Sequence, residues 1–179
     1  MKKKNQVFIA TSLDGYIADK SGEIDWLHSI PNPNNVDMGY GEFIAKIDAL
    51  VMGRKTFETV CSFDMDWPYQ IPVFVLSNTL KEISGKFKDK AQLLKGTLNE
   101  ILKKIHGNGF HNLYIDGGVT IQGFLKEDLI DEMTITTIPI LLGGGIPLFS
   151  EVPNSLNFEC VESKIYLNKV VQNKFIRKH

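Results

Sequence analysis

Two short segments join an apolar run to glycine and to side chains that bind phosphate. The first is VMGRKT, in which a glycine, two cations and a hydroxyl follow the run: Gly53, Arg54, Lys55 and Thr56. The second is YIDGGVT, in which Gly117 and Gly118 precede Thr120. A helix that starts at such a junction presents free N–H groups and the positive end of its dipole, which suits phosphate. Two junctions predict a ligand with a pyrophosphate and a further phosphate, and NADPH fits that description.

The alternative interpretation of each junction is ordinary turn chemistry, because strand–glycine–helix junctions are common. The sequence lacks G-x-x-x-x-G-K-[ST], which disfavours a nucleoside triphosphatase. It also lacks G-x-G-x-x-G, which disfavours an ordinary Rossmann dinucleotide site. A phosphate ligand must therefore be bound by a different design.

The elements that position these junctions follow from hydrophobic periodicity. Apolar runs predict strands at residues 7–12, 49–52, 73–76, 112–116 and 131–142. Helical spacing predicts helices at residues 37–47, 56–61, 98–105 and 119–129. Two alternating runs predict a terminal hairpin with Leu167 and Asn168 near its turn. This order predicts an α/β fold with a mostly parallel sheet and an antiparallel edge, which binds ligands beyond the carboxyl ends of its strands.

Length and composition limit the class of protein. We expect one domain over residues 1–179, because 179 residues with 43% hydrophobic content suit a single core. The net charge of -1 disfavours nucleic acid or an anionic membrane as the main partner. Two lone cysteines and four histidines without metal-ligand spacing disfavour a disulfide framework and a zinc site. The apolar runs are too short for a signal segment or a membrane span, so we expect a cytoplasmic protein with a small-molecule substrate.

Four segments, taken in order, resemble the dihydrofolate reductase superfamily: SLDGYIAD, VMGRKTFE, VLSN and YIDGG…GFLKEDLIDEMTITTIPILLGGGIPLF. Within it they are most similar to the reductase domain of riboflavin-biosynthesis deaminase–reductases and its stand-alone bacterial relatives. The resemblance runs from about residue 7 to residue 149. It implies a dihydrofolate reductase-like domain with helices on both faces of the sheet, NADPH across the carboxyl edge, and a homodimer.

The resemblance also implies roles for individual residues in cofactor binding. Arg54 is similar to the arginine that meets the 2′-phosphate of NADPH, and Thr56 with the backbone of Lys55 is similar to the pyrophosphate cradle. The remaining cofactor positions are Ala10, Ile17, Gly53, Leu76, Ser77, Asn78, Gly117, Gly118, Val119, Thr120 and Ile121. The resemblance therefore accounts for the two cations after a buried strand, because it places the phosphate groups of the cofactor there.

Asp37 and Thr136 are the candidate catalytic pair. Counted back from M-G-R, Asp37 coincides with the acid that engages the pterin in folate reductases, and Thr136 coincides with its hydroxyl partner. As a proton relay in an apolar pocket, the pair predicts a raised pKa for Asp37. The alternative is that Asp37 caps the following helix.

Asp14 and Trp26 are the candidate substrate contacts. Asp14 lies in the SLDG loop, which closes over the nicotinamide in the resembling family, and Trp26 is placed to form an apolar wall. The alternatives are a simple Asp-Gly turn for Asp14 and ordinary packing for Trp26.

The segment after SLDG departs from the riboflavin-pathway pattern. Those reductases usually carry Ser-x-Trp-Ile-Ser/Thr and a nearby arginine for the ribose phosphate, whereas this chain reads GEIDWLHSIPNP and has no arginine before Arg54. Three hypotheses follow. The chain is an NADPH-dependent reductase of a pterin- or pyrimidine-like heterocycle, the 5-amino-6-(5-phosphoribosylamino)uracil reductase of riboflavin biosynthesis, or a non-catalytic module that binds NADPH or another phosphorylated ligand.

Overall fold

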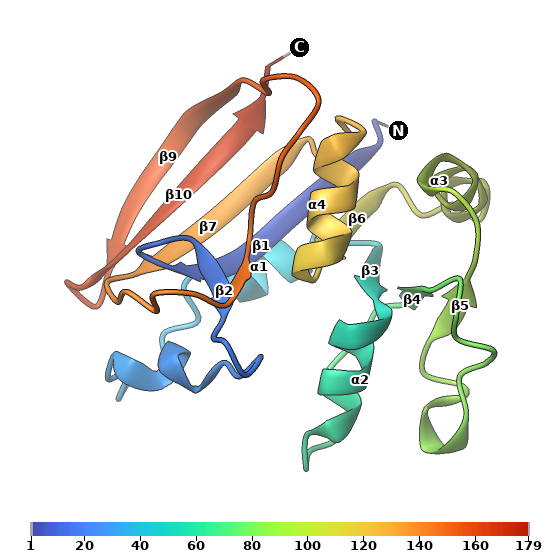
Figure 1. Ribbon diagram of the computed structural model, residues 1–179, viewed down its shortest axis with the longest axis horizontal. Coiled ribbons are helices and arrows are strands. Elements are labelled where there is room, and N and C mark those ends of the chain that lie inside the picture. The colour runs from blue at the N-terminus through green and yellow to red at the C-terminus, as the bar shows by residue number, and fades with distance from the viewer. Residues whose placement is uncertain (1, 179) are drawn as a thin grey trace.

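The computed structural model describes residues 2–178, and its main feature is an eight-stranded sheet (Figure 1). In spatial order the strands are β5 (Gln92–Leu94), β4 (Val73–Leu76), β3 (Ala49–Gly53), β6 (Asn112–Asp116), β1 (Lys4–Ser12), β7 (Glu132–Ile138), β10 (Val170–Arg177) and β9 (Phe158–Tyr166). The strands from β5 to β7 are parallel, whereas β10 is antiparallel to both β7 and β9. The predicted α/β fold is confirmed.

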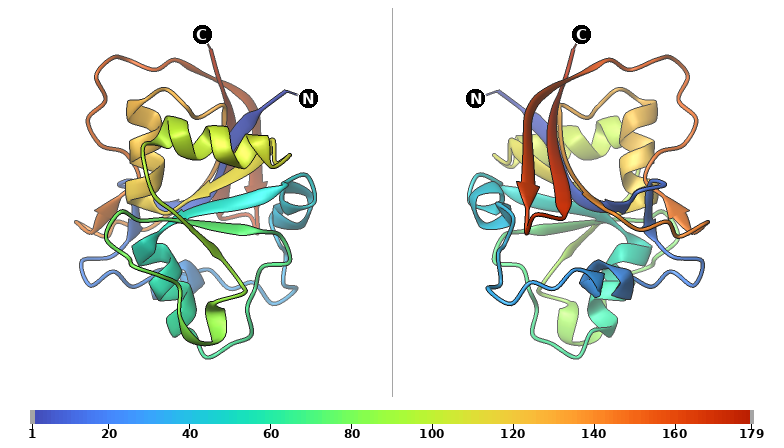
Figure 2. Two further views of the ribbon diagram at one scale, coloured as in Figure 1. Left: turned by 90° about the vertical axis from the view of Figure 1, so that its right-hand side faces the viewer. Right: turned by 90° about the vertical axis from the view of Figure 1, so that its left-hand side faces the viewer.

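Helices cover both faces of the sheet. Figure 2 shows α3 and α4 against one face, and α2 with the short helix η1 against the other. The helices are η1 (Asp25–Ser29), α1 (Tyr40–Ile44), α2 (Arg54–Ser62), η2 (Gly85–Phe87), α3 (Leu98–Gly107) and α4 (Gly118–Lys126). A separate two-stranded ribbon joins β2 (Tyr16–Ala18) to β8 (Ile146–Pro147).

The centre of the sheet is buried on both faces, which explains the uninterrupted apolar run of β3. Ala49 and Val51 pack into the core beneath α3 and α4, whereas Leu50 and Met52 pack into the core beneath α1 and α2. All four side chains are fully buried. The strand that leads to VMGRKT is therefore held rigidly, and its end is fixed relative to the neighbouring strands.

Several predicted boundaries change in the structure. Helix α1 covers only Tyr40–Ile44, and β7 ends at Ile138, directly before Pro139, which cannot donate to a ladder. The hairpin turn lies where it was predicted: Leu167 and Asn168, with φ of 54° and 53°, are the central residues of a turn closed by the bond from Lys169 N to Tyr166 O. None of the described helices is long and apolar enough to cross a membrane.

Candidate functional site

A cleft of about 970 Å³ crosses the carboxyl ends of the parallel strands. The start of α2, which follows β3, and the start of α4, which follows β6, both line it. Figure 1 shows the two helices on opposite sides of the sheet, with their first turns near its centre. Both junctions singled out in the sequence therefore open into one cavity.

The two helix starts fit closely against each other. A Cβ atom on Gly117 would overlap Oγ1 of Thr56, and one on Gly53 would lie 2.7 Å from Oγ1 of Thr120. Gly117 also has a φ of 90°, which side chains rarely allow. The glycines let the two hydroxyls and the free N–H groups of both helices converge. We call the segments 53–56 and 117–120 the phosphate end of the cleft.

The cations at this end are open to a ligand. The Arg54 side chain is 42% exposed, and its Nε lies 3.7 Å from Glu58 Oε1, a loose pair one turn along the helix. Lys55 is exposed at the cleft. A guanidinium can donate in parallel to two phosphate oxygens, so this geometry suits a phosphate monoester beside α2.

The cofactor positions predicted from the sequence come together, with one exception. Every one of them except Ile121 lines the cleft. The Ile121 side chain is fully buried in the core and its N–H donates to Gly117 O, so Ile121 offers nothing to the cleft and that assignment is corrected. Ser77 Oγ accepts from Leu80 N within its own loop, and Asn78 Oδ1 accepts from Gly96 N in the loop after β5.

Asp37 does not form the predicted relay. It is exposed, it does not line the cleft, and its carboxylate accepts hydrogen bonds of 3.0 Å from the N–H groups of Gly39 and Gly41. These bonds lower its pKa, so the expected upward shift is wrong. The N-cap of α1 is Gly39, so Asp37 is not the capping residue itself, although its carboxylate accepts from two N–H groups at the start of that helix.

Thr136 is bonded to an amide instead of a carboxylate. It is buried, and its Oγ1 accepts a hydrogen bond of 2.9 Å from Nε2 of Gln172, which also donates to Met38 O at 3.0 Å. Gln172 thus occupies the space between Thr136 and the segment that carries Asp37. The sequence signal was available but weak: Gln172 has the same inward phase on β10 as the buried Val170.

The two predicted substrate contacts also have structural roles. Asp14 accepts from Ser12 Oγ and from the N–H groups of Leu142 and Gly143, which lowers its pKa and fixes the glycine loop before β8. Trp26 is buried against Ile138 and Val170. Neither residue lines the cleft.

η1 nevertheless contributes to the cleft through residues beside Trp26. Ile24 and Leu27 line it from the η1 side, Val60 lines it from α2, and Phe63 lines it from the position directly after α2. We call these four residues the apolar end. It can take the flat face of a ring, because aliphatic and aromatic side chains pack well on apolar surfaces.

Asp116 is the functional candidate that the sequence reading missed. It ends β6 and lines the cleft directly before Gly117, whose N–H donates to Asp116 Oδ1 at 2.9 Å. Burial raises its pKa to about 6. It shares a strand face with Tyr114, which packs beneath α1 and α2, so its carboxyl group lies on the face that carries the apolar end. The available signal was an acid that closes an otherwise apolar strand at the carboxyl edge.

The topology of the sheet and the cleft across its carboxyl edge define a dihydrofolate reductase-like α/β protein. The chain belongs to the RibD C-terminal domain family, whose model matches residues 3–172. This membership confirms the resemblance and supports a reductase-type oxidoreductase.

Three similar proteins illustrate the relationship. Uncharacterized protein YwjB of Bacillus subtilis (strain 168) is 34% identical over 179 residues, and the match covers 99% of each chain. A putative riboflavin biosynthesis protein from Shewanella sp. PV-4 is 58% identical with a TM-score of 0.96, over 98% of this chain and 99% of that one. Dihydrofolate reductase from Enterococcus faecalis, complexed with NADP(H) and RAB-propyl, is 17% identical with a TM-score of 0.67, over 98% and 97%. The last of these likenesses concerns the fold alone.

Proposed function

We propose that the chain is an NADPH-dependent reductase that delivers a hydride to a small pterin- or pyrimidine-like heterocycle. The observation that carries the proposal is the continuity of one cleft, in which two glycine-opened helix starts and Arg54 adjoin an apolar end. A phosphate-rich cofactor and a flat substrate can be bound side by side in such a cavity.

The residues of the phosphate end fit the cofactor. The first-turn N–H groups of α2 and α4, with Thr56 and Thr120, would hold the pyrophosphate, and Arg54 would hold the 2′-phosphate. Ser77 and Asn78 would border the adenosine ribose. When bound, NADPH supplies the hydride, and the protein supplies position and charge.

Asp116 is the group that we assign to the substrate. Reduction of a C=N bond adds a hydride to carbon and a proton to nitrogen, so a proton donor is needed beside the ring. A carboxyl group with a pKa of about 6 is partly protonated near neutral pH and can donate that proton or accept a ring N–H. Its place on the face of the apolar end supports this role.

Family membership favours a second candidate, the 5-amino-6-(5-phosphoribosylamino)uracil reductase of riboflavin biosynthesis. The similar protein from Shewanella is described as a putative riboflavin biosynthesis protein. This candidate shares the cofactor and the hydride transfer, and it differs in requiring a phosphorylated substrate.

Two measurements test the proposal. NADPH binding is followed by energy transfer from tryptophan to the nicotinamide, and turnover is followed by loss of nicotinamide absorbance with a panel of pterins and aminopyrimidines. We expect saturable NADPH binding and oxidation with at least one ring. Binding without any turnover would favour a non-catalytic binding module, and failure to bind NADPH would overturn the proposal.

A further inference from the structure

Charge is divided along the cleft. Among the described residues that line it, the cationic side chains are Arg54 and Lys55, and both lie in the first turn of α2. The proposed cofactor carries three phosphate groups, and the phosphate end is the place where those groups would be neutralised. Both cations of the lining are therefore assigned to the cofactor.

The apolar end has a different character. Its walls are the aliphatic side chains of Ile24, Leu27 and Val60 and the ring of Phe63, which is 38% exposed. A ring that slides between η1 and α2 would lose water on both faces. The walls offer a flat, uncharged ring favourable contact, whereas a charged group here would lose solvation without gaining a partner.

Two exposed carboxylates follow residues of these walls in the sequence. Asp25 follows Ile24 and begins η1, and Asp64 follows Phe63 beyond the last residue of α2. Both are exposed next to residues that line the cleft. We call Asp25 and Asp64 the acidic rim. Like charges repel, so neither carboxylate offers a phosphate a counter-charge at this opening.

We infer that the substrate is a flat, uncharged heterocycle without a phosphate ester, held between the walls of the apolar end. The inference rests on the proposed function and narrows it, because it separates this chain from an enzyme that requires a ribosyl phosphate. An amino or hydroxyl substituent is compatible with the acidic rim, since the carboxylates accept hydrogen bonds.

A matched pair of substrates tests the inference directly. 5-Amino-6-ribosylaminouracil and its 5′-phosphate differ only in the phosphate ester, and each is offered to the NADPH-saturated protein. We expect kcat/KM to be higher for the unphosphorylated compound by about tenfold or more, as for a substrate that avoids several unfavourable charge contacts. An equal or higher kcat/KM for the phosphate overturns the inference and leaves the proposed reductase intact.

A binding measurement gives an answer even without turnover. Ribose 5-phosphate is titrated into the free protein and into the protein saturated with NADP+. We expect weak binding to the free protein, at the phosphate end, and its loss when NADP+ is present. Binding that persists in the NADP+ complex reveals a second phosphate site and overturns the inference. Failure to bind NADP+ itself counts against the proposed function instead.

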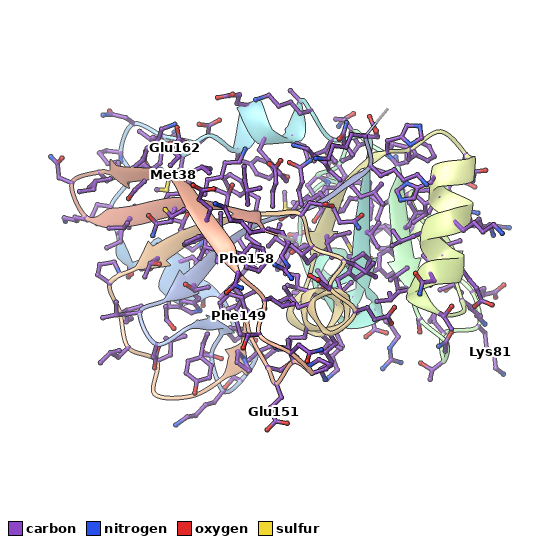
Figure 3. All side chains as sticks on the ribbon, turned by 90° about the horizontal axis from the view of Figure 1, so that it is seen from above. Met38, Lys81, Phe149, Glu151, Phe158 and Glu162 are labelled. Carbon is purple, nitrogen blue, oxygen red and sulfur yellow. The ribbon has the colours of Figure 1, made fainter. Side chains whose placement is uncertain are left out.

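Two charge-reversal variants test whether the acidic rim sets the preference for the unphosphorylated substrate. Asp64→Lys places a cation in the acidic rim, and Glu151→Lys makes the same change of charge on a loop where the side chain projects away from the sheet (Figure 3). We expect Asp64→Lys to improve kcat/KM for the phosphate by about two- to fivefold, the effect of an exposed charge pair. Glu151→Lys should leave the preference unchanged. Equal effects of the two variants would show that net charge, and not the rim, sets the preference.

Discussion

At the scale of single residues, Asp116 and Arg54 represent the two halves of the cleft. The Asp116 carboxyl group is partly buried on the face of the apolar end, and Arg54 is partly exposed at the phosphate end. One is suited to a neutral ring and the other to a phosphate. Their substitutions should therefore affect different measurements.

Asp116→Asn tests this partly buried carboxyl group through the pH dependence of stability. Its pKa is raised from 3.8 to about 6, so between these values the folded protein binds more protons than the unfolded chain. The free energy of unfolding should therefore fall as the pH rises through this window. Urea unfolding should show that slope in the wild type and a weaker one in Asp116→Asn, while Asp89→Asn, an exposed change, keeps it.

Turnover should fall ~10²–10⁴-fold in Asp116→Asn with NADPH affinity nearly unchanged. Unaltered turnover would assign the proton to water.

Arg54→Ala tests the choice of cofactor. Loss of a charge-assisted hydrogen bond of roughly 1.5–3 kcal/mol should weaken NADPH binding by ~10- to 100-fold. NADH lacks the 2′-phosphate, so its affinity should change much less. Lys81→Ala serves as the control, because it removes an exposed cation that does not line the cleft (Figure 3). Equal losses of affinity for both cofactors would show that Arg54 does not bind the 2′-phosphate.

Asp37 should matter for stability and not for turnover. Asp37→Ala removes the acceptor of two backbone N–H groups at the start of α1, which should lower the free energy of unfolding by ~1 kcal/mol. Asp37→Asn has one acceptor oxygen and can keep one of those two bonds, so it should lose less stability than Asp37→Ala. Thermal melting and NADPH oxidation measured on both variants check this expectation. A loss of activity in the well-folded Asn variant would restore Asp37 to the catalytic site.

At the scale of elements, the interlocked starts of α2 and α4 determine the phosphate end. Two strands with buried faces fix the helices, and glycine at each junction lets the hydroxyl of the other helix approach. The sheet therefore sets the distance between the two phosphate-binding turns. The cofactor site is a property of neighbouring elements, and no single helix forms it.

Gly117→Ala should disrupt this contact. The residue has a φ of 90° and its new Cβ would meet Thr56, so we expect a loss of ~1–3 kcal/mol in unfolding free energy and a severe loss of NADPH binding. Gly107→Ala is the matched control, because Gly107 ends α3 and a Cβ there meets no atom within 4 Å among the described residues. It should be neutral or slightly stabilising, since alanine favours helix. Calorimetry and NADPH titration compare the two; normal binding in Gly117→Ala contradicts the interlock.

Features that are marked by a local sequence pattern could be predicted, whereas features that depend on tertiary packing could not. The strands β3, β4 and β6 and both glycine junctions were predictable, because a buried parallel strand is apolar without interruption and its exit is marked locally. The position of Asp37 was inferred by counting back from M-G-R without gaps, and Asp37 directly follows a loop with two prolines, where no local pattern fixes the register. The amide of Gln172 reaches Thr136 and Met38 O only through tertiary packing. The three-residue β5 was too short and too exposed to have a periodic signal.

At the scale of the whole molecule, the sheet is asymmetric. The edge at β5 is three residues long, whereas the edge at β9 is nine residues long and nearly every residue in it is exposed. Ile165 on β9 and Val171 on β10 are direct cross-strand neighbours, and they are 69% and 38% exposed. Apolar side chains that adjoin on an open sheet face suit contact with a second copy of the chain.

We therefore propose a symmetric homodimer that buries this face of the β9–β10 hairpin. A C2 interface is the commonest arrangement and places each such patch against its own copy. Light scattering should give about twice the chain mass of 20.2 kDa at micromolar concentration. Ile165→Glu combined with Val171→Glu should yield monomers, because two buried, unpaired carboxylates oppose association. Met65→Glu changes a side chain that is 58% exposed on the loop after α2, and it should leave the dimer intact. A wild-type mass near 20.2 kDa contradicts the dimer, and a dimer that survives the double substitution moves the interface elsewhere.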